Sequence, residues 1–394
     1  MKRAAVLGGG PAGAFAAERL AEAGWKVVVL DEKLAWEKPC GGGLTRKAYT
    51  QYPFLIENDT PKKLVTRTVM AVSGTGAVNF RLGDPLLIYS RYDLNRLMLE
   101  RAERAGARVE KARVREAQRA GAGWSIQTTG GVIDADYCIV AMGARNPLRE
   151  LGTQLGSDDA MTALGYYVPG QSDHIDLQFL EQFEGYIWAF PRCGHLSVGI
   201  CGKGLPAQAL RRTLEQYLCE RGLTWNGSPF YSHLLPSLRT PSWKSNRVSG
   251  EGWMAVGDSA GLVDPITGEG LYYAIRSADL AARALISQGE AAAGEAYRRA
   301  LWREIGAELE FASRIASRVF LGSFLLASVP ARMIQFTRHS PTFSAIMQDL
   351  FAGRQGYLDL KSRLWRSLHR TLGETALSVL GRRNCPALED DPQS

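Results

Sequence analysis

The segment that decides the fold lies near the start of the chain and reads Ala4-Ala5-Val6-Leu7-Gly8-Gly9-Gly10-Pro11-Ala12-Gly13. Its apolar first half predicts a buried strand, and the alanine-rich sequence after the glycines predicts a helix. The glycines permit a tight turn, close approach of the backbone to a phosphate, and close packing of strand and helix. Asp31, 18 positions after Gly13, ends a second predicted strand, where a carboxylate can accept a ribose hydroxyl. A Rossmann-type dinucleotide unit is therefore predicted, with contacts from Gly8, Gly10, Ala12, Gly13 and Asp31.

A second glycine-rich stretch, residues 257–270, reads Gly-Asp-Ser-Ala-Gly-Leu-Val-Asp-Pro-Ile-Thr-Gly-Glu-Gly. It connects a predicted strand at 253–256 to a predicted helix at 272–285. Asp258 can reach a ribityl hydroxyl, and the loop brings backbone amides and a helix N-terminus toward a flavin, where negative charge grows on reduction. An ordinary connection with a turn aspartate is the alternative. Together the two stretches indicate FAD, and the contacts expected from this one are Asp258, Gly268, Gly270 and Leu271.

Four blocks of the sequence resemble the geranylgeranyl reductase family, within the larger group of flavoproteins related to aromatic hydroxylases and flavin-dependent halogenases. Besides the two glycine-rich stretches, they are Lys-Pro-Cys-Gly-Gly-Gly-Leu at 38–44, and Gly-Tyr-Ile-Trp-Ala-Phe-Pro at 185–191 with Val-Gly-Ile-Cys-Gly at 198–202. A looser match covers 91–97. The resemblance runs over nearly the whole chain. It implies an α/β fold with a Rossmann-like FAD-binding domain, a mixed-sheet catalytic domain and a C-terminal helical extension.

The resemblance also implies cofactor contacts outside the glycine-rich stretches. Arg91, at the start of a predicted helix, would contact the flavin nucleotide, because its charge suits a diphosphate; a solvated surface arginine is the alternative. Val114, within a strand predicted at 109–117, would face the adenine edge, with a plain core valine as the alternative. Hydroxylases carry Asp-Gly where this chain has Met142-Gly143. The electron donor therefore stays open between NADPH, ferredoxin and a quinol.

The block at 38–44 carries the candidate catalytic residue. Cys40 follows a proline and precedes three glycines, so this loop can approach a flavin and bring the thiol with it. We expect Cys40, Gly41 and Gly43 to neighbour the flavin. Hydride transfer to an alkene leaves the other carbon in need of a proton, which the Cys40 thiol or a positioned water could donate. A small residue packed under the flavin is the alternative role.

Three aromatic residues, Tyr186, Trp188 and Phe190, alternate along one predicted strand. A period of two places all three on one face of the sheet. Such a flat aromatic surface suits a polyprenyl or other apolar substrate near the flavin. The alternative is that these rings pack the sheet against a helix, since aromatic residues are favoured in strands.

The expected domains are discontinuous. Residues 1–45, 87–146 and 247–288 are expected to form the FAD-binding domain, and residues 46–86 and 147–246 the substrate and catalytic domain. Residues 289–383 are expected to form a helical C-terminal region. Residues 384–394, with three acids and two prolines, are expected to be a disordered tail.

Composition limits the function further. The chain has 394 residues, 45% of them hydrophobic, and can bury a large core. Its six cysteines form no Cys-x-x-Cys pair and its five histidines no ligand-spaced pair. We therefore expect reduced thiols, a cytoplasmic location and no metal site. No recognised nucleic-acid module accompanies the formal net charge of +7, so nucleic acid is not an expected partner.

The C-terminal region is rich in arginine and includes an apolar segment at 319–329. This segment is too short to span a bilayer, which takes about 20 apolar residues. One interpretation is an interfacial amphipathic anchor that gives peripheral contact with the inner face of an anionic membrane. The alternative is a helical cap whose apolar stripe packs on the catalytic domain while its arginines face water.

The resemblance implies a FAD-dependent reductase that saturates carbon–carbon double bonds of an isoprenoid chain, in a geranylgeranyl-type lipid or a quinone side chain. Two alternatives stay open. A monooxygenase or halogenase shares the fold and the cofactor stretches but needs oxygen, and the Trp-x-Trp-x-Ile-Pro pattern of tryptophan halogenases does not occur in the sequence. A non-catalytic flavin- or lipid-binding protein at a membrane would show slow flavin reduction with every donor.

Overall fold

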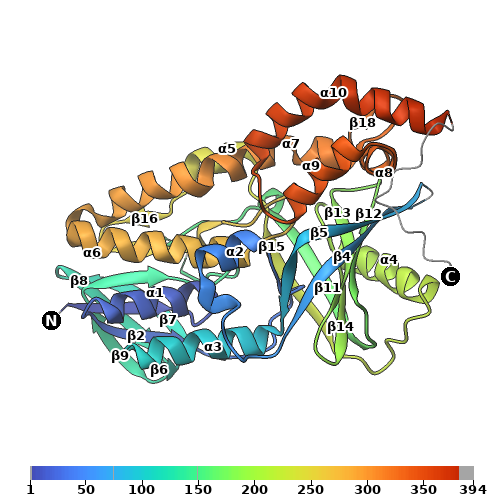
Figure 1. The fold of residues 1–394 in the computed structure, drawn as a ribbon. Coiled ribbons are helices and arrows are strands. Elements are labelled where there is room, and N and C mark those ends of the chain that lie inside the picture. Colours follow the sequence, from blue (N-terminus) through green and yellow to red (C-terminus); the bar gives the residue numbers. More distant parts are fainter. Residues whose placement is uncertain (1, 74, 149, 381–394) are drawn as a thin grey trace. The chain divides into compact units, whose positions relative to one another are not determined.

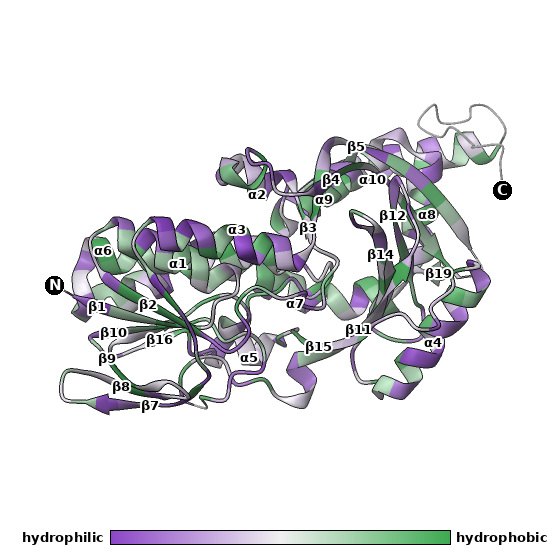
Figure 2. Cartoon of the chain, turned by 90° about the horizontal axis from the view of Figure 1, so that it is seen from below, coloured by the Kyte–Doolittle hydropathy of each residue, from purple (hydrophilic) through white to green (hydrophobic). Residues whose placement is uncertain are grey.

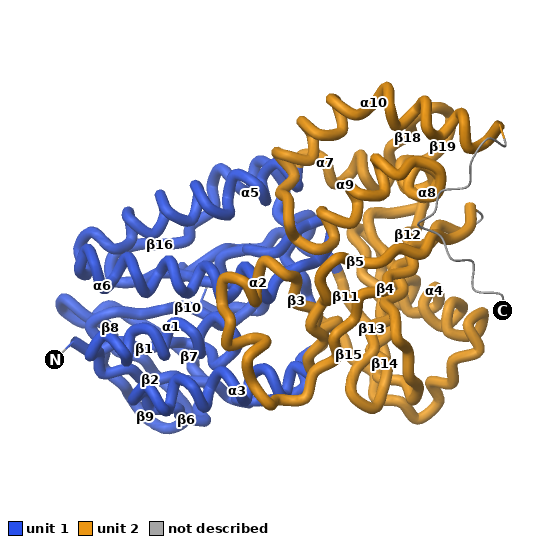
Figure 3. The backbone as a smooth tube through the Cα atoms, in the orientation of Figure 1, with its two compact units in different colours: residues 1–38, 90–161, 234–313 blue, residues 39–89, 162–233, 314–394 orange. Residues whose placement is uncertain are grey.

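The computed structural model describes residues 2–73, 75–148 and 150–380 (Figure 1). The chain divides into two compact units, drawn in two colours in Figure 3. Unit 1 comprises residues 1–38, 90–161 and 234–313, and unit 2 comprises residues 39–89, 162–233 and 314–394. These bounds differ from the expected ones: residues 39–45 and 87–89 belong to unit 2, and residues 147–161 and 234–246 belong to unit 1. The expected helical region is shared between the units at residue 313. The tail expected at 384–394 lies outside the described residues.

Unit 1 is built on a six-stranded sheet with the order β16-β17-β10-β1-β2-β6. The strands are β1 (Arg3–Leu7), β2 (Lys26–Asp31), β6 (Arg108–Lys111), β10 (Tyr137–Val140), β16 (Ser249–Gly250) and β17 (Trp253–Ala255). The strands from β17 to β6 are parallel, and β1, β2 and β10 are apolar and buried because both faces of the sheet are covered. Figure 2 shows α1 (Pro11–Glu22), α3 (Arg91–Arg104) and α6 (Leu271–Leu301) on one face.

The other face of this sheet carries an antiparallel meander of β7 (Val114–Ala120), β8 (Gly123–Thr128) and β9 (Gly131–Ala135). The prediction of one strand at 109–117 is therefore wrong, because the chain forms β6 and then β7. The Ala112 amide donates to the carbonyl of Asp31 at 2.9 Å, which ends the parallel pairing before the chain turns into the meander. Val114 is the first residue of β7 and is buried.

Unit 2 is built on an eight-stranded mixed sheet with the order β15-β11-β14-β13-β12-β4-β5-β3. The strands are β3 (Gly43–Leu44), β4 (Lys62–Val72), β5 (Gly76–Tyr89), β11 (Ala160–Pro169), β12 (His174–Phe179), β13 (Gly185–Pro191), β14 (His195–Gly202) and β15 (Phe230–Pro236). Helix α4 (Ala207–Glu220) covers one face, where Leu210 and Leu214 pack with Ile187. The opposite face forms a second core in which Phe179 packs with Phe320. Strands with alternating burial thus supply two different apolar faces.

The last part of the chain is helical. A π-helical turn, Trp302–Gly306, follows α6 and leads into α7 (Ala307–Leu321), α8 (Val329–His339), α9 (Pro341–Phe351) and α10 (Tyr357–Val379). A short hairpin of β18 (Ser323–Phe324) and β19 (Ala327–Ser328) separates α7 from α8, and two further short helices are α2 (Arg46–Gln51) and α5 (Thr240–Ser245). Within the described ranges, every helix is too short or too polar to cross a bilayer.

Candidate functional site

The turn between β1 and α1 is shaped by contacts between backbone atoms. Gly8 has a φ of +109°, and a Cβ atom there would lie 2.3 Å from the carbonyl oxygen of Ala141. A Cβ atom at Gly13 would lie 1.8 Å from the carbonyl oxygen of Gly8. Only glycine fits these two positions, because the backbone of a neighbouring strand or turn cannot move away. The first turn of α1 is thereby held against the end of β1, as in a nucleotide-binding turn.

The N-terminus of α1 has the properties of an anion site. Gly10 is the N-cap, and no side chain caps the helix, so its first amides need another acceptor. Nothing lies within 4 Å of the position that a Cβ atom of Gly10 would occupy. The helix amides, the helix dipole and this open space together fit the diphosphate of FAD.

Asp31 is fixed at the end of β2 by backbone donors. Its Oδ2 accepts a hydrogen bond from the Gly9 amide at 2.7 Å, and its Oδ1 accepts from the amides of Lys33 at 2.7 Å and Leu34 at 2.8 Å. Oδ2 accepts one hydrogen bond and keeps acceptor capacity, so the same side chain can take a ribose hydroxyl. Asp31 therefore ties the second strand to the glycine turn and stands where the sequence predicted it.

The two glycine-rich stretches meet in unit 1. Gly257 has a φ of +58°, and a Cβ atom there would lie 3.2 Å from the Cβ atom of Ala12 in α1. The helix that follows the first stretch thus packs on the loop that carries Asp258. The Asp258 carboxylate pairs with the Nζ atom of Lys38 at 3.1 Å. This ion pair places a basic and an acidic group beside the second stretch, and sequence reasoning did not single out Lys38.

The loop between Asp258 and α6 is held by Asp264. This buried carboxylate accepts hydrogen bonds through Oδ1 from the amide of Ile266 at 2.8 Å and through Oδ2 from the hydroxyl of Thr267 at 2.8 Å. The loop ends at Gly270, the N-cap of α6, where again no side chain caps the helix. Gly268 and Leu271 flank this second helix N-terminus, which fits an electron-rich part of a cofactor. Sequence reasoning missed Asp264, although an Asp-Pro pair four residues before a glycine is a turn signal.

Arg91 lies at the start of α3 and is buried, with 3% of its surface exposed, so the alternative of a solvated arginine is wrong. Its guanidinium donates to Oδ1 of Asn95 at 3.3 Å, and its Nε has no hydrogen-bond partner among the described residues. Glu37, which the sequence did not reveal, accepts from the amide of Arg91 at 2.9 Å and from the hydroxyl of Ser90 at 2.5 Å. A buried, incompletely paired guanidinium suits a phosphate of FAD.

In unit 2, the Cys40 loop is held by a fully buried arginine. Arg192 donates to the carbonyl of Cys40 at 2.7 Å and to the carbonyl of Tyr89. Ser197 also donates to the Cys40 carbonyl, at 3.2 Å, and lies 3.0 Å from the hydroxyl of Tyr231. Burial is the main cause that raises the pKa of Tyr231, which keeps its hydroxyl protonated. The network fixes the loop backbone and leaves the partly exposed thiol of Cys40 as an acceptor for the Gly42 amide at 3.2 Å.

The predicted aromatic face is formed by β13, and its members differ in surroundings. A Cβ atom at Gly41 or Gly43 would lie 3.2 or 3.1 Å from the ring of Phe190, so this ring lies against the Cys40 loop. Tyr186 packs instead with Phe179 in the core, with ring centroids 6.3 Å apart. Trp188 is buried, and the centroid of its ring lies 6.0 Å from that of Tyr186. Of the three rings, Phe190 is therefore the one that the structure brings to Cys40.

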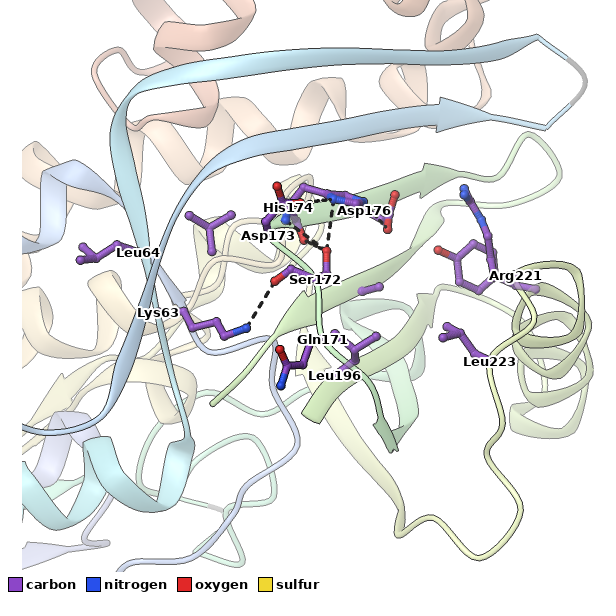
Figure 4. Close-up of a pocket in the computed structure, with 13 residues that line it drawn as sticks. Lys63, Leu64, Gln171, Ser172, Asp173, His174, Asp176, Leu196, Arg221 and Leu223 are labelled. Carbon is purple, nitrogen blue, oxygen red and sulfur yellow. Dashed lines mark hydrogen bonds and ion pairs between the residues drawn. The ribbon is translucent and has the colours of Figure 1, made fainter. Parts of the chain in front are cut away.

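A separate hollow of about 740 Å³ opens on the face of the unit 2 sheet that α4 covers (Figure 4). His174 lies in it, 2.9 Å from Asp173 and 3.4 Å from Asp176. The hydrogen bond with Asp176 is the main cause that raises the pKa of His174, Asp173 adds to it, and burial opposes both. Because Ala189 lines this hollow while Phe190 points to the other face, the hollow is not part of the Cys40 site.

No group of three or more His, Cys, Asp or Glu side chains that could hold a metal ion occurs in the described part of the chain. The groups that unit 1 assembles are of another kind. They are two helix N-termini without side-chain caps, two carboxylates at strand ends and a buried guanidinium, and all of them fit FAD. Val114 lies two residues after Ala112, whose amide donates to the carbonyl of Asp31, so it stays a predicted neighbour of the adenine edge.

The chain was compared with known families, proteins and structures. No family model matches the chain. A menaquinone reductase of Mycobacterium tuberculosis is 30% identical over 314 residues, which cover 72% of this chain and 76% of the relative. A digeranylgeranylglycerophospholipid reductase of Methanothrix thermoacetophila is 28% identical, covering 70% and 75%. The structure of a geranylgeranyl bacteriochlorophyll reductase-like protein of Thermoplasma acidophilum has a TM-score of 0.74 at 20% identity, covering 93% of this chain and 99% of that one.

The sequence relatives together with the fold define a FAD-dependent oxidoreductase. The likeness to the Thermoplasma structure confirms the predicted α/β fold with its mixed sheet and C-terminal helices. The chain belongs to the family of flavin-dependent reductases that includes the geranylgeranyl and menaquinone reductases, as the blocks at 38–44 and 185–191 predicted.

Proposed function

We propose that this protein uses FAD to reduce carbon–carbon double bonds in the isoprenoid chain of a lipid or a quinone. The two relatives described above are named for menaquinone and for digeranylgeranylglycerophospholipid, and both compounds carry polyprenyl chains. An apolar chain of this kind suits the aromatic side of β13. The electron donor in the proposal is NADPH or reduced ferredoxin.

The observation that carries the proposal is the position of Cys40, whose backbone is fixed by Arg192 and whose loop lies against Phe190. Saturation of an alkene adds a hydride to one carbon and a proton to the other. FAD supplies the hydride chemistry when it is bound. The Cys40 thiol would hold the proton and release it to the second carbon. Phe190 would contact the isoprenoid chain of the substrate and exclude water from it. The reduction of an unactivated alkene requires such alignment and exclusion of water.

The test is an anaerobic turnover. The purified holoenzyme is reduced with dithionite and mixed with geranylgeranyl lipids or with prenyl quinones, and flavin reoxidation and product mass are followed. A product two hydrogens heavier, formed without oxygen and still heavier after any quinol head group has been reoxidised to the quinone, supports the proposal, and the panel identifies the substrate class. Flavin that stays reduced until air is admitted, with a product that gains oxygen or halogen, would overturn it in favour of a monooxygenase or halogenase. Flavin that every donor reduces slowly, with tight lipid binding, would indicate a non-catalytic carrier.

The proton donor is tested by Cys40→Ala and Cys40→Ser. We expect the alanine variant to lower kcat about 100-fold while the flavin content stays at the wild-type level, because positioned general acids contribute that much. Cys40→Ser keeps an acceptor for the Gly42 amide and serves as the structural control. Equal and unchanged kcat in both variants would assign the proton to another group.

A further inference from the structure

Residues 314–380 of unit 2 combine positive charge with exposed apolar surface. The segment contains nine lysines and arginines and three acidic residues, so it carries +6 of the chain's formal net charge of +7. Sixteen large apolar side chains are exposed among the described residues, and ten of them lie in this segment. They are Leu321, Phe324, Leu325, Leu326, Leu358, Trp365, Leu372, Leu377, Val379 and Leu380. Basic residues beside exposed apolar residues are the pattern of a surface that binds anionic lipid.

The hairpin of β18 and β19 presents three of these side chains together, Phe324, Leu325 and Leu326. Phe324 pairs with Ala327, so Leu325 and Leu326 form a two-residue turn. Both leucines have left-handed backbone, with φ of +50° and +65°. Leu325 is 52% exposed and Leu326 is fully exposed, at 105%. Two-residue hairpins with positive φ at both positions favour Asn-Gly, because a branched side chain is strained there. This chain instead places two leucines in the strained turn and exposes both to water.

Arg332 of α8 holds the turn of the hairpin in place. Its guanidinium donates to the carbonyl of Phe324 at 3.0 Å and to the carbonyl of Leu325. The ring of Phe324 packs edge-on against Phe336 of the same helix, with centroids 6.3 Å apart. Ser328 caps α8 by accepting from the amide of Ala331 at 3.1 Å, and α8 packs on β4 and β5. The two leucines are thus carried on a supported hairpin rather than on a loose loop.

The two helices that flank the hairpin, α7 and α8, each carry an arginine close to it in the sequence. Arg332 lies directly beneath the turn carbonyls, and Arg318 is exposed in the last turn of α7, three residues before Leu321. One acid, Glu181, accepts from the hydroxyl of Ser328. Together with the +6 charge of the segment, the two arginines favour a negatively charged partner.

We propose that the hairpin tip, Phe324-Leu325-Leu326, inserts into the surface of an anionic lipid bilayer while Arg318 and Arg332 face the lipid headgroups. The transfer of leucine and phenylalanine side chains from water to the acyl boundary lowers the free energy. This favourable transfer offsets the strain of the left-handed turn. The proposal is independent of catalysis, since it concerns where the protein resides and not which bond it reduces. It gives the basic C-terminal region a defined contact point.

The test replaces the tip by the sequence that the turn geometry favours, Leu325→Asn with Leu326→Gly. We expect the melting temperature to stay equal or rise, because Asn and Gly accept positive φ. Binding to vesicles of phosphatidylcholine mixed with phosphatidylglycerol, measured by co-sedimentation, should fall at least about ten-fold. Val132→Thr with Ile286→Gln, at two exposed apolar residues of unit 1, is the matched control and should bind as the wild type does.

The charge contribution is tested by Arg318→Gln, which should lower binding to the mixed vesicles about two- to five-fold and leave the weak binding to pure phosphatidylcholine unchanged. The proposal would be overturned if the wild-type protein did not bind the mixed vesicles. It would also be overturned if the tip variant bound them as well as the wild type does. A wild-type dimer in analytical ultracentrifugation that the tip variant abolishes would also overturn it, because a second copy of the chain would then cover the leucines.

Discussion

Glycines serve different purposes in the two units. At Gly8 and Gly13 of unit 1, an added Cβ atom would meet carbonyl oxygens at 2.3 and 1.8 Å, so these residues let main chain pack on main chain. At Gly41 and Gly43 of unit 2, it would meet the ring of Phe190 at 3.2 and 3.1 Å, so these residues make room for a side chain. In the first case the contact of Gly13 with Gly8 is local, whereas Gly8 itself meets Ala141 at the end of another strand. The second case depends on a residue about 150 positions away, which a local pattern cannot contain.

The largest expected effect breaks the main-chain packing of unit 1. Gly13→Ala should lower the free energy of unfolding by more than about 3 kcal/mol and abolish flavin retention, because backbone cannot move away from the new Cβ atom. Gly10→Ala is the matched control, since nothing lies within 4 Å of its Cβ position and its φ is −69°. This control should fold normally and bind FAD about ten-fold more weakly, because its methyl group enters the diphosphate space. Flavin absorbance per chain and urea unfolding measure both, and equal stability of the two variants would refute the argument.

The next effect removes the side chain that holds the glycine loop of unit 2. Arg192→Met should lower the free energy of unfolding by about 3 kcal/mol, because the carbonyls of Cys40 and Tyr89 lose a buried charged donor. Arg67→Met, in a half-exposed ion pair with Asp173, should change it by less than about 1 kcal/mol. Chemical denaturation of the holoprotein compares the two. Similar losses would mean that burial of Arg192 is unimportant.

A smaller effect separates the two faces of β13. Phe190→Leu should raise KM for a prenyl substrate about three- to ten-fold with little change in stability, because the ring lies beside the Cys40 loop. Ile187→Val, on the face packed against α4, should lower the free energy of unfolding by about 1 kcal/mol and leave KM unchanged. Steady-state kinetics and thermal melts of both variants test which face of β13 contacts the substrate. A KM shift in the Ile187 variant alone would reverse the assignment of faces.

The smallest effect concerns acid stability in the C-terminal helices of unit 2. Burial opposes ionisation of Glu374, but hydrogen bonds from Ser340, Thr342 and Arg370 prevail and lower its pKa to about 2. A carboxylate with a depressed pKa stabilises the fold fully above its unfolded value near 4.5 and loses that contribution as the pH falls toward about 2. Glu374→Gln should therefore flatten the dependence of stability on pH between these values. Acid unfolding curves measure this slope of stability against pH. If the slope is the same in the variant and the wild type, the hydrogen bonds to Glu374 contribute little to stability.

The sequence predicted the parts of the site that neighbouring residues determine. The turn from Gly8 to Gly13, the strand end at Asp31 and the alternation of Tyr186 and Phe190 all lie where they were expected, because each follows from the period or the spacing of one element. The FAD-dependent reductase family was likewise recognised from such blocks. The individual roles of the site residues remain predictions.

Contacts between distant segments were not predictable. Glu37 stabilises the start of α3 from 54 positions away, and Arg192 reaches the Cys40 carbonyl across 152 positions. Neither stands in a recognisable motif, since any acid or base brought there by the fold could serve. The break between β6 and β7 was missed for the same reason, because residues 109–117 contain no glycine or proline to mark it while the pairing partner changes from β2 to β8.

The alternation of the two units along the chain has an evolutionary consequence. Each unit is made of three separate stretches, so no single cut in the gene yields either unit whole. Recombination at one crossover point cannot exchange unit 2 of one family member for that of another. Exchange of one whole unit between such chains therefore takes several crossovers, whereas substitutions within a single lineage can change one unit and leave the other intact.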